Sequence, residues 1–537
     1  MGFVGYPDWT PRPAARRIRG VTYDVAIIGS SFAGSLLAIL ARRMGKSVVL
    51  LERGQHPRFV IGESSTPLAN LLLEELADRY DLPWLRPFSK WGTWQSCHPE
   101  IPCGLKRGFS FYFHQPGQLW KPQASRDNEL LVAASPNDAL ADTHWFRPDF
   151  DAHFVRMAMR SGVSYVDQIS LAPPRGRAGA WELSGERLGT TERFAAAYLV
   201  DGSGPLGYLT KAWNMAGKAP GSAPLATQSL YTHFTGVKQW SDWSERSLED
   251  ATAPPFPPDD AALHHVFPGG WIWVLRFNNG VVSAGCAVTD DLATELRLEE
   301  GAAAWARLME RFPGIGAQFR AAQPVQKFTY RPRLSAGVAQ TTGPGWCLLP
   351  GSAGFVDPLL STGFVLNLLG LERLAAIWER GGEPGELNYN REVLGDLNVT
   401  ADLVRGLYQL MANPTAFRDL LQLYFAAASY AETARRLGRP EVAPGFLLRH
   451  HPTFHRGFDR CLKSLDQGGA KNIGELVGSV IQEFDVAGLS APGKRNWYPC
   501  DAADLFNSAA KLGVGTVEIA AMLKRVGFSH PAAEDAV

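Results

Sequence analysis

The sequence predicts an α/β fold (α+β), in which a Rossmann-like βαβ domain, an inserted antiparallel sheet and a C-terminal helical region share one chain. Three observations predict it. An apolar run at residues 23–28 passes through a glycine turn into a helical stretch, residues 229–285 have strand composition with turn residues between, and residues 390–537 are mainly helical in composition. We predict a dinucleotide-binding domain at 23–225 and 325–385, a substrate-side β-sheet domain at 226–324, a helical region at 386–537 and an N-terminal arm at 1–22.

The glycine turn is the most informative stretch. Val25–Ile28 form a buried strand, a helix follows Gly34, and a second strand ends at Glu52. A glycine lets the backbone approach a pyrophosphate, the helix N-terminus favours an anion, and the terminal acid accepts from a ribose hydroxyl. The middle glycine of the G-x-G-x-x-G pattern is replaced by serine, and the alternative is an ordinary turn in an α/β protein. We assign the dinucleotide contacts to Gly29, Ser30, Ser31, Ala33, Gly34 and Glu52.

Two more loops have the composition of cofactor contacts. Residues 56–67 are rich in small polar side chains beside the nucleotide unit, and residues 346–363 form a glycine- and serine-rich loop that opens a long apolar helix. The plain alternative is a connection with no ligand. The candidate cofactor residues of these loops are Gly62, Glu63, Ser64, Gly351, Asp357 and Gly363.

A single strand is predicted at residues 104–114. Alternation places Phe109, Phe111 and Phe113 on one face, and Lys106 on the other face with Ser110, Tyr112 and His114. Lys106 is a candidate functional cation. The alternative is a solvated lysine on a strand, which is the usual state of this residue.

The composition excludes several classes of protein. The 537 residues are 45% hydrophobic and 20% charged, as in globular proteins, and a net charge of zero gives no support for nucleic acid or an anionic membrane as partner. No apolar run approaches the roughly 20 residues of a membrane span. The six cysteines form no C-x-x-C pair, so we expect reduced thiols in a cytoplasmic enzyme and no metal site.

Taken together, these segments resemble the flavin-dependent halogenases, within the wider fold of aromatic flavoprotein monooxygenases. The likeness covers about residues 22–380 and rests on residues 29–34, 56–67, 104–118 and 355–363, with further similarity at 229–233, 263–273 and 311–320. It implies FAD that arrives as FADH2 from a separate flavin reductase. O2 then gives a flavin hydroperoxide, and a halide ion, chloride or bromide, gives hypohalous acid.

The resemblance also implies roles for individual residues. Lys106 is the matching catalytic lysine, which holds the oxidant near a small electron-rich aromatic substrate, either as an ammonium donor or as an amine. Ser361, Thr362 and Gly363 match the halide site. Phe111, His114, Trp271 and Trp273 are the candidate pocket residues.

Two departures from the family pattern leave alternatives open. Tryptophan halogenases carry a glutamate where this chain has Leu360, which favours phenol- or pyrrole-type substrates over tryptophan itself. The W-x-W-x-I-P pattern here ends in Leu275 and Arg276, and alternation places Arg276 opposite the tryptophans. The alternatives are a flavin monooxygenase that hydroxylates an aromatic substrate on the same scaffold, and a non-catalytic flavin-binding protein. With one convincing dinucleotide fingerprint, we expect no reduction of the flavin by NADH or NADPH without a reductase.

Overall fold

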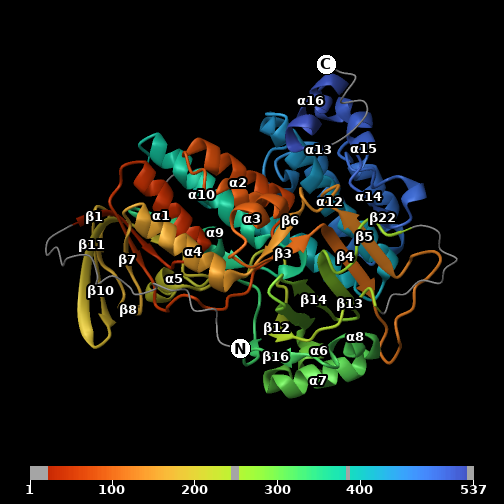
Figure 1. Ribbon diagram of the computed structural model, residues 1–537, viewed down its shortest axis with the longest axis horizontal. Coiled ribbons are helices and arrows are strands. Elements are labelled where there is room, and N and C mark those ends of the chain that lie inside the picture. Colours follow the sequence, from red (N-terminus) through yellow and green to blue (C-terminus); the bar gives the residue numbers. More distant parts are fainter. Residues whose placement is uncertain (1–21, 243–252, 383–386, 529–537) are drawn as a thin grey trace.

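The fold is built on two nine-stranded sheets with helices packed between and around them (Figure 1). The computed structural model describes residues 22–242, 253–382 and 387–528, so nearly all of the predicted N-terminal arm lies outside the described residues. The mixed α/β architecture with a C-terminal helical region confirms the predicted fold class.

The first sheet holds the predicted βαβ unit. Its parallel strands are β1 Thr22–Ile28, β2 Val48–Leu51, β7 Ser164–Val166, β11 Thr190–Asp201 and β20 Trp346–Leu348. In the register, Val25 lies between Val48 and Tyr198. The remaining strands are β8 Ile169–Leu171, β9 Arg175–Arg177, β10 Ala180–Arg187 and β19 Thr342–Gly343. All four residues of β2 are buried, because helices and neighbouring strands cover the sheet.

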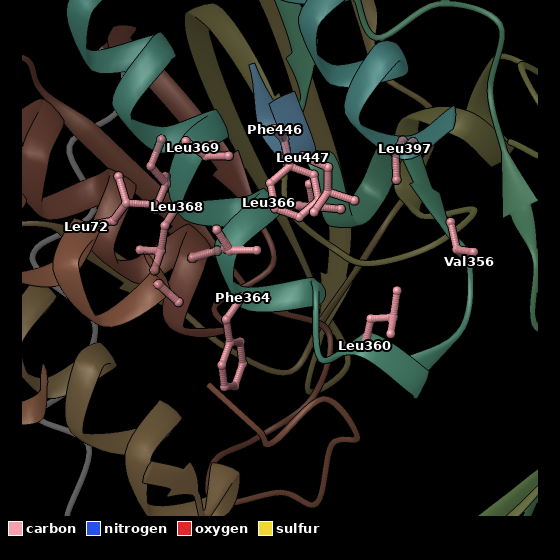
Figure 2. Close-up of a cluster of buried hydrophobic side chains, with 14 of the residues drawn as sticks. Leu72, Val356, Leu360, Phe364, Leu366, Leu368, Leu369, Leu397, Phe446 and Leu447 are labelled. Carbon is pink, nitrogen blue, oxygen red and sulfur yellow. The ribbon is translucent and has the colours of Figure 1, made fainter. Parts of the chain in front are cut away.

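Helix α1 (Phe32–Arg43) follows the glycine turn and packs against α4 and α10, beside which α2 lies (Figure 1). Residues 32–41 of α1 are all buried, which explains its almost entirely apolar composition. Figure 2 shows how α10 contributes Phe364, Leu366, Leu368 and Leu369 to the same core, near Leu72 of α2. The helices of this region are α2 Pro67–Arg79, α3 Trp91–Cys97, α4 Arg147–Arg160, α5 Tyr208–Ala212, α9 Pro350–Ala353 and α10 Gly363–Glu379.

The second sheet draws on three distant parts of the chain. Its strands are β4 Gly108–Phe113, β5 Glu129–Ala133, β12 Thr227–Thr235, β13 Ala262–Phe267, β14 Gly270–Arg276, β15 Val282–Thr289, β16 Gln323–Pro324, β17 Thr329–Arg331 and β22 Trp497–Tyr498. The sheet is therefore not confined to the predicted range 226–324. Strands β4 and β5 come from the range assigned to the dinucleotide domain, and β22 comes from the C-terminal region.

Both faces of this sheet are covered. Helices α6 Asp290–Leu296, α7 Ala302–Arg311 and α8 Pro313–Phe319 belong to the core on one face. On the other face, the rings of Phe109 and Phe425 lie 5.5 Å apart and those of Phe111 and Phe417 lie 6.1 Å apart, which brings in α12. The C-terminal helices are α11 Leu387–Leu410, α12 Pro414–Arg436, α13 Pro452–Asp466, α14 Ile473–Ile481, α15 Ala502–Asn507 and α16 Thr516–Val526.

The predicted strand at 104–114 is wrong in one respect, because it is two strands in different sheets. Strand β3 (Cys103–Lys106) pairs with β6 (Asp142–Trp145), and β4 begins at Gly108. Arg107 breaks the run: its N–H donates to the Asp260 carbonyl and its guanidinium pairs with Asp138. Alternation does not continue across this break, and the Lys106 ammonium lies over the Phe109 ring instead of on the face of Ser110. The small strands β18 Ala336–Gly337 and β21 Gly354–Phe355 pair elsewhere.

Two absences concern the described part of the chain. Within it, no helix is both long enough and apolar enough to cross a membrane. The six cysteines, all of which lie in the described ranges, are free thiols.

Candidate functional site

The β1–α1 turn has the geometry that a dinucleotide requires. Gly29 has φ +98°, and a Cβ at this position would lie 2.5 Å from the Gly202 carbonyl oxygen, so only glycine fits. The Glu52 carboxylate, at the end of β2, accepts from the Ser30 N–H and hydroxyl at 3.0 Å each. Burial opposes ionisation of Glu52, but Arg58 and two backbone N–H groups hold the pKa below its ordinary value. Glu52 Oε1 accepts one bond, from Gly54, and has capacity left for a ribose hydroxyl.

The other predicted turn residues divide into two groups. Ser31 is the N-cap of α1 with φ −63°, so this position does not need a glycine conformation, and its side chain is partly exposed. Ala33 and Gly34 lie inside α1, where they are buried. A Cβ on Gly34 would lie 2.0 Å from the Gly29 carbonyl, so this glycine serves the close packing of helix on turn.

A second wall beside the turn is formed by the glycine loop after β11 and by the starts of α9 and α10. Gly202 donates to the Ile28 carbonyl, and Gly204 donates to the Ser352 hydroxyl at 3.0 Å. Asn367 of α10 accepts from Gly351 and donates to the Gly363 carbonyl. The ends of β1 and β11, the start of α9 and the start of α10 are thus joined by hydrogen bonds. The glycine turn after β11 was the available sign of this wall.

The loop at 56–67 is held to other elements by its polar groups. Gly62, with φ +90°, accepts from the Arg147 guanidinium at 2.7 Å. The Glu63 carboxylate is 2.6 Å from His233 of β12 and buried, so it joins two domains instead of facing open space. Ser64 forms a bridge with His144 of β6, and its buried hydroxyl has no partner among the described residues.

The turn before α10 is fixed from behind by two tyrosines of the C-terminal helices. Tyr408 of α11 donates to Asp357 Oδ2 at 2.9 Å, and Tyr424 of α12 donates to the Leu360 carbonyl at 2.8 Å. Ser361 has a left-handed φ of +53°, and Thr362 is the N-cap of the 17-residue helix. A Cβ built on Gly363 would meet nothing within 4 Å, so the first residue of the helix adjoins open space. A helix start that faces open space is suited to a small anion.

Lys106 is completely buried, which contradicts the alternative of a solvated strand lysine. Its Nζ donates to the Ser65 carbonyl at 2.5 Å and lies 4.0 Å from the centroid of the Phe109 ring. Burial lowers the pKa of Lys106 to about 7, and the carboxylate of Asp142 opposes this shift. A lysine held in this way can offer donors to a bound molecule near neutral pH.

An apolar cavity of about 380 Å³ lies next to the Phe109 ring that the Lys106 ammonium contacts, although Lys106 itself is not one of its lining residues. Phe109, which carries the Lys106 contact, and Thr66 and Pro67 of the loop before α2 form one side. The C-terminal region forms most of the remainder, with Tyr424, Phe425, Ala428, Phe446, Tyr498, Leu505, Met522 and Leu523 in the wall. Charged side chains at the same cavity include Lys90, Glu432 and Arg436.

Comparison with known proteins finds curated relatives that are halogenases. No protein-family model matches the chain. The monodechloroaminopyrrolnitrin halogenase of Pseudomonas fluorescens is 30% identical over 368 residues, which are 66% of this chain and 61% of that protein. The tetracycline 7-halogenase of Kitasatospora aureofaciens is 30% identical over 373 residues, which are 66% of this chain and 64% of that protein.

Solved structures agree on the fold. The halogenase PltM, crystallised with phloroglucinol and FAD, superposes with a TM-score of 0.78 at 23% identity, covering 88% of this chain and 99% of that chain. The brominase Bmp2 superposes with a TM-score of 0.54 at 23% identity, covering 80% of this chain and 93% of that chain. The curated relatives are halogenases, and the chain is similar in sequence to the flavin-dependent halogenase family. Its alignments span less than two thirds of the two curated relatives.

The altered halogenase pattern at the end of β14 has a structural explanation. The Arg276 guanidinium donates to Asp259 Oδ1 at 2.8 Å and to the Val237 carbonyl at 3.0 Å. It therefore ties the residues Val237 and Asp259 to the end of β14. This arrangement gives no support to a changed oxygen chemistry at Arg276.

Four residues expected in the halogenase pocket lie outside the lining of the 380 Å³ cavity. Phe111 stacks on His264 at 4.4 Å. Trp271 donates to Tyr408 at 3.1 Å, behind the turn that precedes α10, and Trp273 donates to Ser283 at 3.3 Å. His114 lies across the sheet, 3.0 Å from His265. The residues of this sheet that line the cavity include Phe109 of β4, Val132 and Ala133 of β5 and Tyr498 of β22. Among the described residues, no group of three or more metal-binding side chains is present.

Proposed function

We propose that this protein is an FADH2- and O2-dependent halogenase that acts on an electron-rich aromatic small molecule. The observation that carries the proposal is a fully buried lysine whose ammonium contacts Phe109, a ring that lines an apolar cavity. Its substrate is a phenol-, pyrrole- or indole-type ring, and chlorination is the reaction that we expect first. The free thiols and the zero net charge support action in the cytoplasm. The resemblance to flavin-dependent halogenases supports a separate flavin reductase as the partner.

FAD would be held by residues that fit it. Gly29 and Ser30 form the turn for the pyrophosphate, Glu52 is the acceptor for a ribose hydroxyl, and Gly204, with open space where a Cβ would be, lies on the facing wall. Bound reduced flavin, with O2 and a halide, supplies the hypohalous acid. The start of α10, at Thr362 and Gly363, is the proposed halide position.

The protein then has three tasks in the reaction. The Tyr408 and Tyr424 hydroxyls keep the turn at 357–363 in one conformation. The Lys106 donors hold the neutral oxidant beside the cavity. The apolar wall excludes water, since free oxidant would otherwise attack the protein itself.

The test uses purified protein, a separate flavin reductase, FAD, and chloride or bromide with a panel of phenols, pyrroles and indoles. We expect product with the isotope pattern of the added halogen. Lys106→Ala should abolish this product, while flavin affinity, measured by fluorescence quenching, and oxygen consumption remain. Lys121→Ala, at an exposed lysine, is the matched control. Hydroxylated product without halogen would favour the monooxygenase alternative, and rapid anaerobic bleaching of the flavin by NADPH alone would contradict the need for a reductase.

A further inference from the structure

Asp142 lies directly opposite Lys106 in the antiparallel ladder of β3 and β6. Opposed residues of such a ladder point to the same face, with Cβ atoms about 4.5–5.5 Å apart. Asp142 is 1% exposed and Lys106 is 0% exposed. Two groups of opposite charge are therefore placed face to face, away from water, by the register of two short strands.

Only one of the two carboxylate oxygens of Asp142 has a hydrogen-bond partner among the described residues. Its Oδ1 accepts from the side-chain amide of Asn70 in α2, at 2.7 Å. Its Oδ2 is buried and has no hydrogen-bond partner among the described residues. A buried carboxylate oxygen without a donor is costly, so its charge requires another form of compensation.

Four other titratable groups lie near the pair. Burial, with a smaller effect of Lys106, lowers the pKa of His144 in β6 and of His264 in β13 to about 3, so both imidazoles are neutral. Burial raises the pKa of Asp142, Lys90 on the cavity side and then Lys106 lower it, and Glu432 raises it. Lys90 therefore compensates the Asp142 charge together with Lys106. Asp142 also acts on Tyr424 and Cys500, both of which line the cavity.

Lys106 itself makes contacts that suit a charged ammonium. It donates to the Ser65 carbonyl and lies over the Phe109 ring, and an aromatic face attracts a cation. An uncharged amine would lose most of the second interaction. The surroundings of Lys106 are therefore built for the protonated state, although burial alone disfavours it.

We propose that Asp142 is a positioning residue that keeps Lys106 in its ammonium state, so that the lysine is a hydrogen-bond donor to the oxidant rather than an amine. This role deepens the proposed function and rests on it. Directly before Ser361 the turn carries Leu360 and no acid, and the acid of the turn, Asp357, is bonded to Tyr408. The acid that lies opposite Lys106 is Asp142, in strand β6.

The sign of the effect follows from the two opposing causes. Burial lowers the pKa of Lys106 and Asp142 raises it. Removing the carboxylate leaves burial unopposed, so the lysine should lose its proton at a lower pH, by about one pKa unit or more. Asn70→Ala should also lower the pKa of Lys106, but by less. Without the Asn70 amide, the charged form of the Asp142 carboxylate would be less stable.

The direct test is a carbon NMR titration of the full chain containing lysine labelled at Cε, with the Lys106→Met spectrum assigning the signal. The titration is run from about pH 5 to pH 9, across the range where a lysine with a depressed pKa changes charge. We expect the midpoint of Lys106 to fall in Asp142→Asn, to fall less in Asn70→Ala, and to return toward the wild-type value in Asp142→Glu. Asp138→Asn, which removes an exposed acid beside Arg107, is the matched control and should leave the midpoint unchanged. An unchanged midpoint in Asp142→Asn would overturn the proposal.

Turnover provides the second arm. With reductase and halide present, halogenation by Asp142→Asn should decline at a lower pH than in wild type, while FAD affinity is unchanged. Halogenation that persists or rises on the alkaline side would show that the amine is the working form, and would also overturn the proposal. The NMR titration needs neither substrate nor turnover, so it tests Asp142 even where the proposed halogenation fails.

Discussion

At the scale of single residues, the glycine turn contains one position that requires glycine, Gly29, and one that does not, Ser31. Gly29 combines φ +98° with a carbonyl oxygen 2.5 Å from any Cβ, so its requirement is both conformational and steric. Ser31, which stands at the middle glycine of the pattern, has an ordinary φ of −63° and a partly exposed side chain. The departure from the glycine pattern is therefore tolerated by the backbone.

This distinction predicts the effect of two substitutions on FAD affinity. Ser31→Gly should change the Kd by less than about threefold, because replacing an N-cap serine by glycine costs only a few tenths of a kcal/mol. Gly29→Ala should abolish measurable binding or the fold around it. Both are measured by quenching of flavin fluorescence. A large loss of affinity in Ser31→Gly would show that the serine hydroxyl itself binds the cofactor.

At the scale of elements, Gly104 lets β3 pack closely between strand β6 and the end of β14. A Cβ on Gly104 would lie 2.0 Å from the Arg276 carbonyl and 3.0 Å from the His144 side chain. This close approach allows β3 to pair with β6 while it abuts the end of β14. The position of Lys106, two residues later on the same face, depends on it.

Gly104→Ala is expected to destabilise the protein by about 1–3 kcal/mol, the usual cost of forcing an extra methyl into a packed site. The free energy of unfolding is measured in urea, together with halogenation. Gly478→Ala is the matched control, since its Cβ would meet nothing within 4 Å and alanine favours a helix. Equal stability of the two variants would show that β3 can move without cost.

The turn at 357–363 is the second element with an external support. Tyr424→Phe removes the donor to the buried Leu360 carbonyl, which should cost about 1 kcal/mol of stability and loosen the turn. We expect a higher KM for halide with FAD affinity unchanged, because the hydroxyl acts on the turn before α10. Tyr498→Phe is the control. Tyr498 lines the 380 Å³ cavity as Tyr424 does, but its hydroxyl accepts from Gln422 and, within the described part of the chain, makes no hydrogen bond to the turn at 357–363. A halide KM equal to wild type in Tyr424→Phe would refute the support role.

At the scale of the whole molecule, the cavity beside Lys106 is assembled from residues that are more than 400 positions apart in the chain. The loop before α2 and strand β4 form one side, and α12, α15 and α16 form much of the other. Its volume of about 380 Å³ lies in the range of pockets for drug-sized ligands, which is more than one aromatic ring requires. Under the proposed function, the C-terminal region limits the size of the substrate that this cavity can hold.

Filling this cavity should change which substrates are accepted. Ala428→Trp places an indole in the wall at α12, so multi-ring aromatics should lose turnover by about tenfold or more, while a single-ring phenol is retained. The ratio of kcat/KM for the two substrates is measured under the same halide concentration. Ala510→Trp, at an exposed position, should leave the ratio unchanged. Equal losses for both substrates would mean that this space is not where the ring binds.

The sequence by itself determined the βαβ turn and its acid, the fold class, and Lys106 as a residue of interest. The βαβ turn and its acid are encoded within about 30 adjacent residues, where spacing and composition report directly on backbone geometry. Strand 104–114 was misjudged because Arg107 leaves the ladder to bond the Asp260 carbonyl, so that β3 and β4 pair in different sheets and the alternation does not continue from Lys106 to Phe109. Only the tertiary structure decided that Lys106 is buried, that Asp142 lies opposite it, and that Tyr408 and Tyr424 hold the turn from behind. These relations join residues 36 to 64 positions apart through strand register and helix packing, which no local pattern specifies.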